Sequence, residues 1–109
     1  MIDYEHFSMV DIRAGQIIEV EDFPRAKNPS YKVKVDFGSE IGIKNSSVQA
    51  TNYTKEELLN LQVIGVVNMP ARNIAGFMSE VLILGVEGED GKLALLTPSR
   101  SAKIGSQAY

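Results

Sequence analysis

Two short apolar runs near the middle of the chain, Val63–Val67 and Val81–Leu84, constrain its fold most strongly. Apolar residues occupy odd and even positions of both runs, so neither predicted strand has a plainly polar face. We therefore expect central strands, or strands whose outer face is covered by another element such as a second subunit. The connection between the runs is polar and aromatic. A rigid strand pair that displays such a connection is a common framework for a binding site.

The length and composition predict one small globular domain. A chain of 109 residues suffices for a single hydrophobic core. It contains no cysteine, which excludes disulfide bonds and thiolate metal sites. The first ten residues lack the apolar region of a signal peptide, so we expect a cytoplasmic protein. No segment approaches the length of a transmembrane helix, and we expect no membrane insertion.

The usual residues of a catalytic centre are sparse. The only histidine, His6, stands near the N-terminus, which argues against a Ser-His-Asp triad. Neither a P-loop nor a Gly-x-Gly-x-x-Gly motif occurs. One carboxylate, Glu80, directly precedes an apolar run, and we expect it to pair with Arg72 or to cap a backbone amide. We therefore predict that the chain is not an enzyme and that it needs no cofactor or metal ion.

Hydrophobic periodicity and turn signals divide the chain into strands and short helices. Thr54 and Glu57 form a capping box, which marks the start of one helix. The dipeptide Asp90–Gly91 predicts the tip of a hairpin. In chain order, the predicted elements are a helix over residues 3–9, strands over 11–23, 32–38 and 40–44, a helix from about 55 to 61, and strands over 62–69, 79–86 and 92–97.

Some details of these strands are also predicted. Gly15 inside the first strand suggests a bend or a β-bulge. In the third strand we expect Ile41 and Ile43 to point inward. The polar run that follows, residues 45–51, suits the close approach of a ligand or of another stretch of backbone. Antiparallel strands with a helix after the third are the layout of the OB-fold, so we predict an all-β, five-stranded Greek-key barrel.

Charge is distributed unevenly along the chain. Its net charge is −3, which argues against strong non-specific binding of nucleic acid. Residues 25–55 nevertheless hold six bases and two acids, a net charge of +4. We predict that the hairpin of the second and third strands carries lysines on its outer face. The candidate contacts to an RNA backbone are Arg25, Lys27, Lys32 and Lys34, and the same outer face is expected to include Lys44.

Several sequence blocks carry a family resemblance. The blocks Asp11–Ile17, Lys34–Gly38 and Val67–Gly76 resemble the tRNA-binding OB domain of small tRNA-binding proteins and of some methionyl-tRNA synthetase extensions. Ile41–Ser47 and Ile74–Leu82 resemble more closely the CsaA-type, export-related chaperones within that family. The resemblance implies that residues 1–109 are a single tRNA-binding-type OB domain, which forms a homodimer through N- and C-terminal extensions.

The resemblance also implies a function and a set of site residues. For the CsaA type it implies an export-related chaperone that binds unfolded or precursor polypeptides without nucleotide, in apolar clefts of the dimer. Methionine suits such a surface because it repacks around different guests. The expected apolar lining is Met69, Phe77, Met78 and Leu82. The expected rim is Lys44, Ser46, Ser47, Asn68, Arg72, Ser79 and Glu80.

Two alternatives remain open at this stage. The wider family implies a tRNA-binding module, which would contact folded tRNA through the barrel face, using the same rim and the basic candidates. The third possibility is an assembly subunit that docks another protein by its barrel face. The acidic net charge and the CsaA-type blocks lead us to rank polypeptide binding first.

Overall fold

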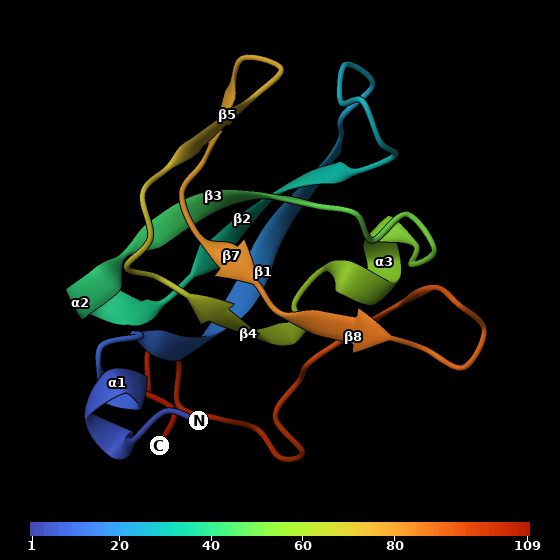
Figure 1. Cartoon of the computed structure of the whole chain (residues 1–109). Helices are drawn as coiled ribbons and strands as arrows, with labels where there is room; N and C mark the ends of the chain where they lie inside the picture. Colours follow the sequence, from blue (N-terminus) through green and yellow to red (C-terminus); the bar gives the residue numbers. More distant parts are fainter.

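The computed structural model describes residues 1–109 and confirms a small barrel of antiparallel strands (Figure 1). Its helices are short and lie outside the barrel wall. In chain order the elements are α1 Tyr4–Ser8, β1 Ile12–Asp22, β2 Tyr31–Asp36, α2 Gly38–Ile41, β3 Ile43–Val48, α3 Lys55–Leu58, β4 Gln62–Val66, β5 Arg72–Ile74, β6 Phe77–Ser79, β7 Leu82–Ile83, β8 Gly85–Glu87 and β9 Leu93–Leu95. None of the helices is long and apolar enough to cross a membrane.

Five strands form the barrel, and the expected OB-fold is confirmed. They are hydrogen-bonded in the order β3-β2-β1-β4-β7, and every pairing is antiparallel. The remaining gap lies between β3 and β7, which contact each other without a regular ladder. Residues 79–81 bridge this gap by hydrogen bonds to β3, so the barrel is nearly closed.

The barrel interior is filled by a compact apolar core. Phe37 is fully buried in this core. Its ring and a methyl group of Val35 leave no room for a side chain at Gly15. Leu58, from the helix that the capping box starts, closes one end and is also fully buried. The core cluster comprises Ile17, Val33, Val35, Phe37, Val48, Ala50, Leu58, Val63, Val81 and Ile83.

The long first strand contains a β-bulge, but not at the expected position. Gly15 pairs regularly with Val63 of β4. The register slips three residues later, between Ile17 and Glu19, which leaves Ile18 as the extra residue. Ile17 is fully buried, whereas Ile18 is 39% exposed. Gly15 instead serves close packing, since a Cβ there would lie 2.7 Å from the Phe37 ring.

The third strand starts later than predicted. Residues that we expected in a strand over 40–44 form α2, and the chain then turns at Gly42, whose φ is +90°. The turn reverses the predicted facing of Ile43, which is 56% exposed instead of buried. Cross-strand pairing of Lys44 with Val35 also places Lys44 on the opposite face from Lys34. The prediction that Lys44 shares the outer face with Lys34 is therefore wrong.

The two apolar runs pair with each other, as expected, and their connection forms a second hairpin that the sequence analysis missed. Val66 lies opposite Leu82 in the pair β4–β7, and Arg72 lies opposite Ser79 in the pair β5–β6. Five residues, 67–71, thus face only two residues, 80 and 81. One long hairpin is interrupted by this unequal segment, and its outer half projects beyond the barrel (Figure 1).

The predicted strand over 79–86 is therefore broken into three pieces. β6 pairs with β5, β7 pairs with β4, and β8 pairs with β9. The predicted hairpin with Asp90–Gly91 at its tip is confirmed by the pair β8–β9. The fourth strand ends at Val66 rather than Met69, and the helix α3 ends at Leu58 rather than Leu61.

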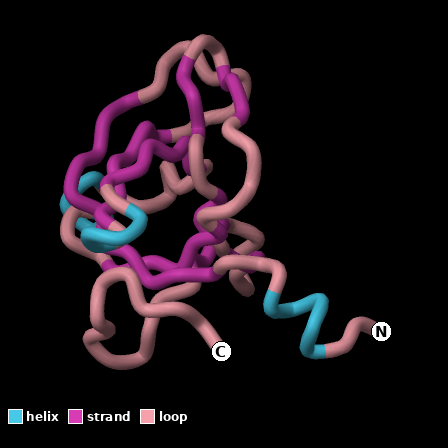
Figure 2. Tube along the Cα trace, turned by 90° about the vertical axis from the view of Figure 1, so that its left-hand side faces the viewer, coloured by secondary structure: helices cyan, strands magenta, loops and turns pink.

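Both chain ends lie at one side of the barrel (Figure 1). The helix α1 is capped by the Asp3 side chain, but none of its residues is buried, and Figure 2 shows it projecting away from the barrel. The C-terminal tail instead follows the edge of β1 that β2 leaves free. The Ala108 amide donates to the Ile12 carbonyl at 2.8 Å, and the Gly105 amide donates to the Ala14 carbonyl at 2.8 Å.

Candidate binding surfaces

The projecting hairpin β5–β6 turns through two residues with positive φ. Ala75 has φ 49° and Gly76 has φ 86°. A two-residue turn with both φ values positive matches the right-handed twist of its strands, which keeps the two strands paired. The Asn73 Oδ1 atom accepts a hydrogen bond from the Gly76 amide at 2.8 Å and fixes the turn. The hairpin therefore presents its side chains in a defined register.

One face of this hairpin packs on the barrel. The rings of Phe77 and Phe23 meet edge-on with their centroids 5.5 Å apart. The Lys32 Nζ atom lies 4.9 Å from the Phe23 centroid and 5.2 Å from the Phe77 centroid. An ammonium group is attracted to ring faces at such distances. Phe77 and Lys32 thus hold the hairpin against the ends of β1 and β2.

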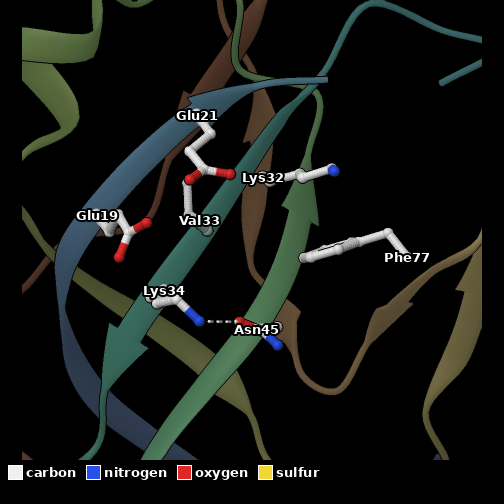
Figure 3. A pocket seen from close by; sticks show the side chains of 7 residues that line it. All are labelled: Glu19, Glu21, Lys32, Val33, Lys34, Asn45 and Phe77. Atoms are coloured by element: carbon white, nitrogen blue, oxygen red, sulfur yellow. Dashed lines mark hydrogen bonds between the residues drawn. The ribbon is translucent and has the colours of Figure 1, made fainter. Parts of the chain in front are cut away.

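The outer face of β1–β3 carries a small polar depression beside Phe77 (Figure 3). Its volume is about 90 Å³. In the register of β1 with β2, Glu21 lies opposite Lys32 and Glu19 lies opposite Lys34. Neither lysine forms an ion pair with a carboxylate. The Lys34 Nζ atom donates instead to the Asn45 Oδ1 atom at 3.1 Å. Both ammonium groups therefore remain without a carboxylate partner.

The edge of β3 is covered by the chain between β6 and β7. The Glu80 side chain accepts from the Asn45 amide at 2.9 Å, and the Glu80 amide donates to the Asn45 carbonyl at 2.8 Å. The Ser79 hydroxyl accepts from the Ser47 amide at 3.1 Å. Of the two expectations for Glu80, the backbone cap is confirmed, and no ion pair with Arg72 forms. The polar run thus receives another stretch of backbone.

Ser46 serves the barrel itself. It is 1% exposed, and its hydroxyl donates to the Val81 carbonyl at 2.9 Å. No buried side-chain nitrogen or oxygen in the structure lacks a hydrogen-bond partner. The Ser46 hydroxyl lies inside the barrel wall and is already hydrogen-bonded, so it is not available to a ligand.

A second face of the same strands is apolar and open. From residue 77 to residue 83 the side chains alternate, with Val81 and Ile83 buried and Met78 and Leu82 on the other side. Met78 is 47% exposed and Leu82 is 46% exposed. Phe77 and Met78 therefore lie on opposite faces, although the sequence analysis placed both in one lining. We call Met78 and Leu82 the outward face of the hairpin; the Glu80 side chain is turned to the edge of β3 instead.

The remaining predicted site residues lie in two places. Asn68 joins β4 to the chain after α1, because its Oδ1 accepts from the Asp11 amide at 2.9 Å and its Nδ2 donates to the Met9 carbonyl at 2.8 Å. Met69 follows it and is 48% exposed. Arg72 is exposed on β5. The structure thus separates Asn68, near the chain ends, from the projecting hairpin.

A partly buried ion pair, which the sequence analysis did not single out, fixes the C-terminal tail. The Arg13 Nε atom donates to the Asp11 Oδ1 atom at 2.6 Å, and the Arg13 Nη1 atom donates to the Gly105 carbonyl at 3.1 Å. The hydrogen bond with Asp11 raises the pKa of Arg13. The available signal was the block Asp11-Ile12-Arg13, in which one residue separates two opposite charges at the start of the predicted strand, so that both can lie on the same face.

The arrangement of these groups is suited to binding. No group of three or more His, Cys, Asp or Glu side chains is placed to hold a metal ion. The notable surface features are an open apolar face, two lysines without carboxylate partners and a projecting hairpin. The fold and these surfaces define a small OB-fold binding domain.

Comparisons with known proteins place this domain in a family. The family model described as "Putative tRNA binding domain" matches residues 12–107. The crystal structure of the CsaA chaperone protein from Picrophilus torridus is 51% identical, with a TM-score of 0.94 and 100% of both chains covered. The chaperone CsaA from Bacillus anthracis is 38% identical, with a TM-score of 0.91, and the match covers 100% of this chain and 99% of that one.

The chain belongs to this tRNA-binding domain family and is of the CsaA type. It also matches a methionine–tRNA ligase from Pyrococcus furiosus, with 37% identity over 106 residues. That match covers 97% of this chain but 14% of the ligase. The chain thus spans about a seventh of the length of the curated relatives it matches, and most of the ligase lies outside the match.

Proposed function

We propose that this protein is a chaperone that binds unfolded polypeptides on the outward face of its interrupted hairpin. The observation that carries the proposal is the pair of apolar side chains Met78 on β6 and Leu82 on β7, each of which is nearly half exposed. The full-length likeness to proteins named as CsaA chaperones supports the same function.

The chemistry of this face suits varied clients. Met78 has a flexible thioether side chain, which adapts to differently shaped apolar groups, and Met69 is a second exposed methionine. Asn73 pairs with Met78 and offers a polar partner on the same face, whereas Arg72 pairs with Ser79 and lies on the other face of the hairpin. Binding would be passive and independent of nucleotide. We further propose that the clients include precursors of secreted proteins and that binding takes place in the cytoplasm.

A paired set of variants tests the polypeptide surface. We expect Met78→Ser combined with Leu82→Ser to weaken binding of an unfolded precursor at least about ten-fold, because burial of one such side chain contributes roughly 1.5–3 kcal/mol. Val86→Ser is the matched control, since Val86 is 59% exposed on β8, away from the hairpin. Equal affinities of the double variant and the control in a titration of the precursor would refute this site.

A second candidate function is binding of tRNA. The family description and the two lysines without carboxylate partners favour it. Lys32 and Lys34 project from the outer face of β2, and Arg25 and Lys27 are exposed in the loop before it. Binding through phosphates would weaken steeply as salt increases. A salt titration with total tRNA and with the unfolded precursor therefore separates the two functions.

A further inference from the structure

A slot that is open to solvent lies between the loop after β1 and the tip of the projecting hairpin. Its volume is about 230 Å³. We call it the Arg25–Phe77 slot. It is lined by Phe23, Pro24, Arg25, Lys32 and Phe77 and by the turn residues 75–76. The loop and the hairpin project at the same end of the barrel (Figure 1). Segments far apart in the sequence thus combine to form the slot.

The charges around Phe77 differ between its two sides. The small depression on one side includes Glu19 and Glu21 together with lysines. The slot on the other side includes Arg25 and Lys32 and no acidic residue. Neither of these two cations forms an ion pair. An anionic group is therefore favoured in the slot and disfavoured beside the glutamates.

The slot also offers surfaces for a planar group. Phe77 lines both the slot and the small depression, and Phe23 lines the slot as well. Arg25 stands on the loop across from Phe77 and is exposed. Unpaired nucleobases stack on aromatic rings and on guanidinium planes. Gly76 at the hairpin tip leaves the entrance open, since a Cβ there would meet no atom within 4 Å.

We propose that the Arg25–Phe77 slot binds one unpaired nucleotide of an RNA strand. The base stacks against Phe77, and the phosphate is held by Arg25 and Lys32. Each nucleotide carries a phosphate beside a planar base, which matches two cations beside an aromatic ring. The inference rests on the second candidate function, RNA binding, and adds contact with a base to contacts with the phosphate backbone.

The test compares single-stranded with double-stranded RNA. The probe is an unstructured oligoribonucleotide of about eight nucleotides, within the range that one OB-fold covers, alone and annealed to its complement. Because the duplex hides the base faces, we expect the wild-type chain to prefer the single strand. Phe77→Leu keeps an apolar contact with Phe23 but removes the stacking surface, and we expect about ten-fold weaker binding of the single strand.

Further variants separate stacking from charge and from folding. Phe77→Trp, unlike Phe77→Leu, keeps an aromatic ring at this position and should retain the preference for the single strand. Arg25→Gln should weaken single-strand binding and reduce its salt dependence, whereas Lys92→Gln removes the same charge from the β8–β9 turn and should do neither. Arg25 is an exposed loop residue, so its substitution leaves the core intact.

Each result bears on the proposal. Unchanged single-strand binding in Phe77→Leu would overturn it. Wild-type protein that binds tRNA but treats the single strand and the duplex equally would overturn the slot and keep RNA binding. Wild-type protein that binds no RNA would overturn both, while leaving polypeptide binding at Met78 and Leu82 untouched. A Phe77→Leu variant that loses the polypeptide but keeps the single strand would assign the slot to polypeptide.

Discussion

At the scale of single residues, the barrel depends on two close contacts that its sequence does not reveal directly. The Phe37 ring occupies the space that side chains at Gly15 and Gly65 would need. The Ser46 hydroxyl is bonded to the Val81 carbonyl inside the wall. Both contacts act between strands far apart in the chain, so each helps to close the barrel that supports the hairpin.

The two glycines provide a graded test of this packing. A Cβ at Gly15 would lie 2.7 Å from both the Phe37 ring and the Val35 side chain, whereas at Gly65 the nearest atom is 3.1 Å away. We expect Gly15→Ala to lower the free energy of unfolding by about 1–3 kcal/mol through overpacking, and Gly65→Ala to lower it less. Urea denaturation of both variants measures the difference. A larger loss for Gly65→Ala would contradict this geometry.

The structural role of Ser46 can be tested in the same way. Ser46→Ala removes the donor to the Val81 carbonyl and leaves that carbonyl without its partner in the wall. We expect the free energy of unfolding to fall by about 1–3 kcal/mol, the usual cost of an unsatisfied buried group. Ser99→Ala is the matched control at an exposed position of the tail. Identical thermal unfolding of the two variants would show that the hydroxyl contributes nothing.

At the scale of elements, the projecting hairpin contributes Met78 to the proposed polypeptide surface and Phe77 to the Arg25–Phe77 slot. It has three residues in each strand, which is too few for a hairpin to be stable alone. Its stability therefore comes from Phe77 packing on Phe23 and from the hydrogen bonds of residues 79–80 with β3. The unequal segment at its base, five residues against two, separates it from the barrel ladder.

The turn of this hairpin contains an avoidable strain. Ala75 adopts φ 49°, which costs an L-residue with a Cβ roughly 1–2 kcal/mol, while Gly76 adopts φ 86° without that cost. We expect Ala75→Gly to slow hydrogen exchange of the β5–β6 amides, because the paired state becomes more favourable. Gly76→Ala should speed it, because φ 86° is strained for a residue with a Cβ. The added methyl group itself would meet no atom within 4 Å. Equal exchange rates in the two variants would contradict this reading of the turn.

The same hairpin shows where sequence reasoning succeeds and where it stops. The alternation of Val33, Val35 and Phe37 and the capping box at Thr54 predict their elements because local patterns determine them. The β5–β6 hairpin escapes such reasoning because its turn contains Ala75, where a glycine or asparagine would have been the usual signal. The opposite facing of Phe77 and Met78 then follows from a pairing that the sequence does not indicate.

Tertiary contacts explain the other differences. Ile43 is apolar, yet the turn at Gly42 directs it outward, and a local pattern cannot record that reversal. The bulge at Ile18 depends on how β1 pairs with β2, not on a glycine in β1. Of the predicted site, the exposure of Met69, Met78 and Leu82 agrees with a binding role, whereas the burial of Ser46 depends on barrel closure and could not be foreseen.

At the scale of the whole molecule, the two chain ends behave differently. The C-terminal tail is fixed to β1 by backbone hydrogen bonds and by Arg13. The N-terminal helix buries none of its own residues, and Tyr4 and Met9 are 73% and 64% exposed. A helix of five residues is not stable in isolation. A groove of about 300 Å³ lies between this helix and the tail, lined by Tyr4, Phe7, Ser8, Val10, Gln107, Ala108 and Tyr109.

We propose that a second copy of the chain covers this groove, which would complete the packing of α1 and form the homodimer that the family resemblance implies. Tyr4→Ser combined with Met9→Ser should weaken dimerisation at least about ten-fold, because two exposed side chains lose their burial between the copies. The barrel should stay folded, since neither side chain contributes to its core. Leu59→Ser, at a 45% exposed position beside α3, is the control. Sedimentation equilibrium over a range of concentrations gives the dissociation constants. A wild-type monomer, or a double variant that dimerises as tightly as the control, would show that α1 packs against a different partner.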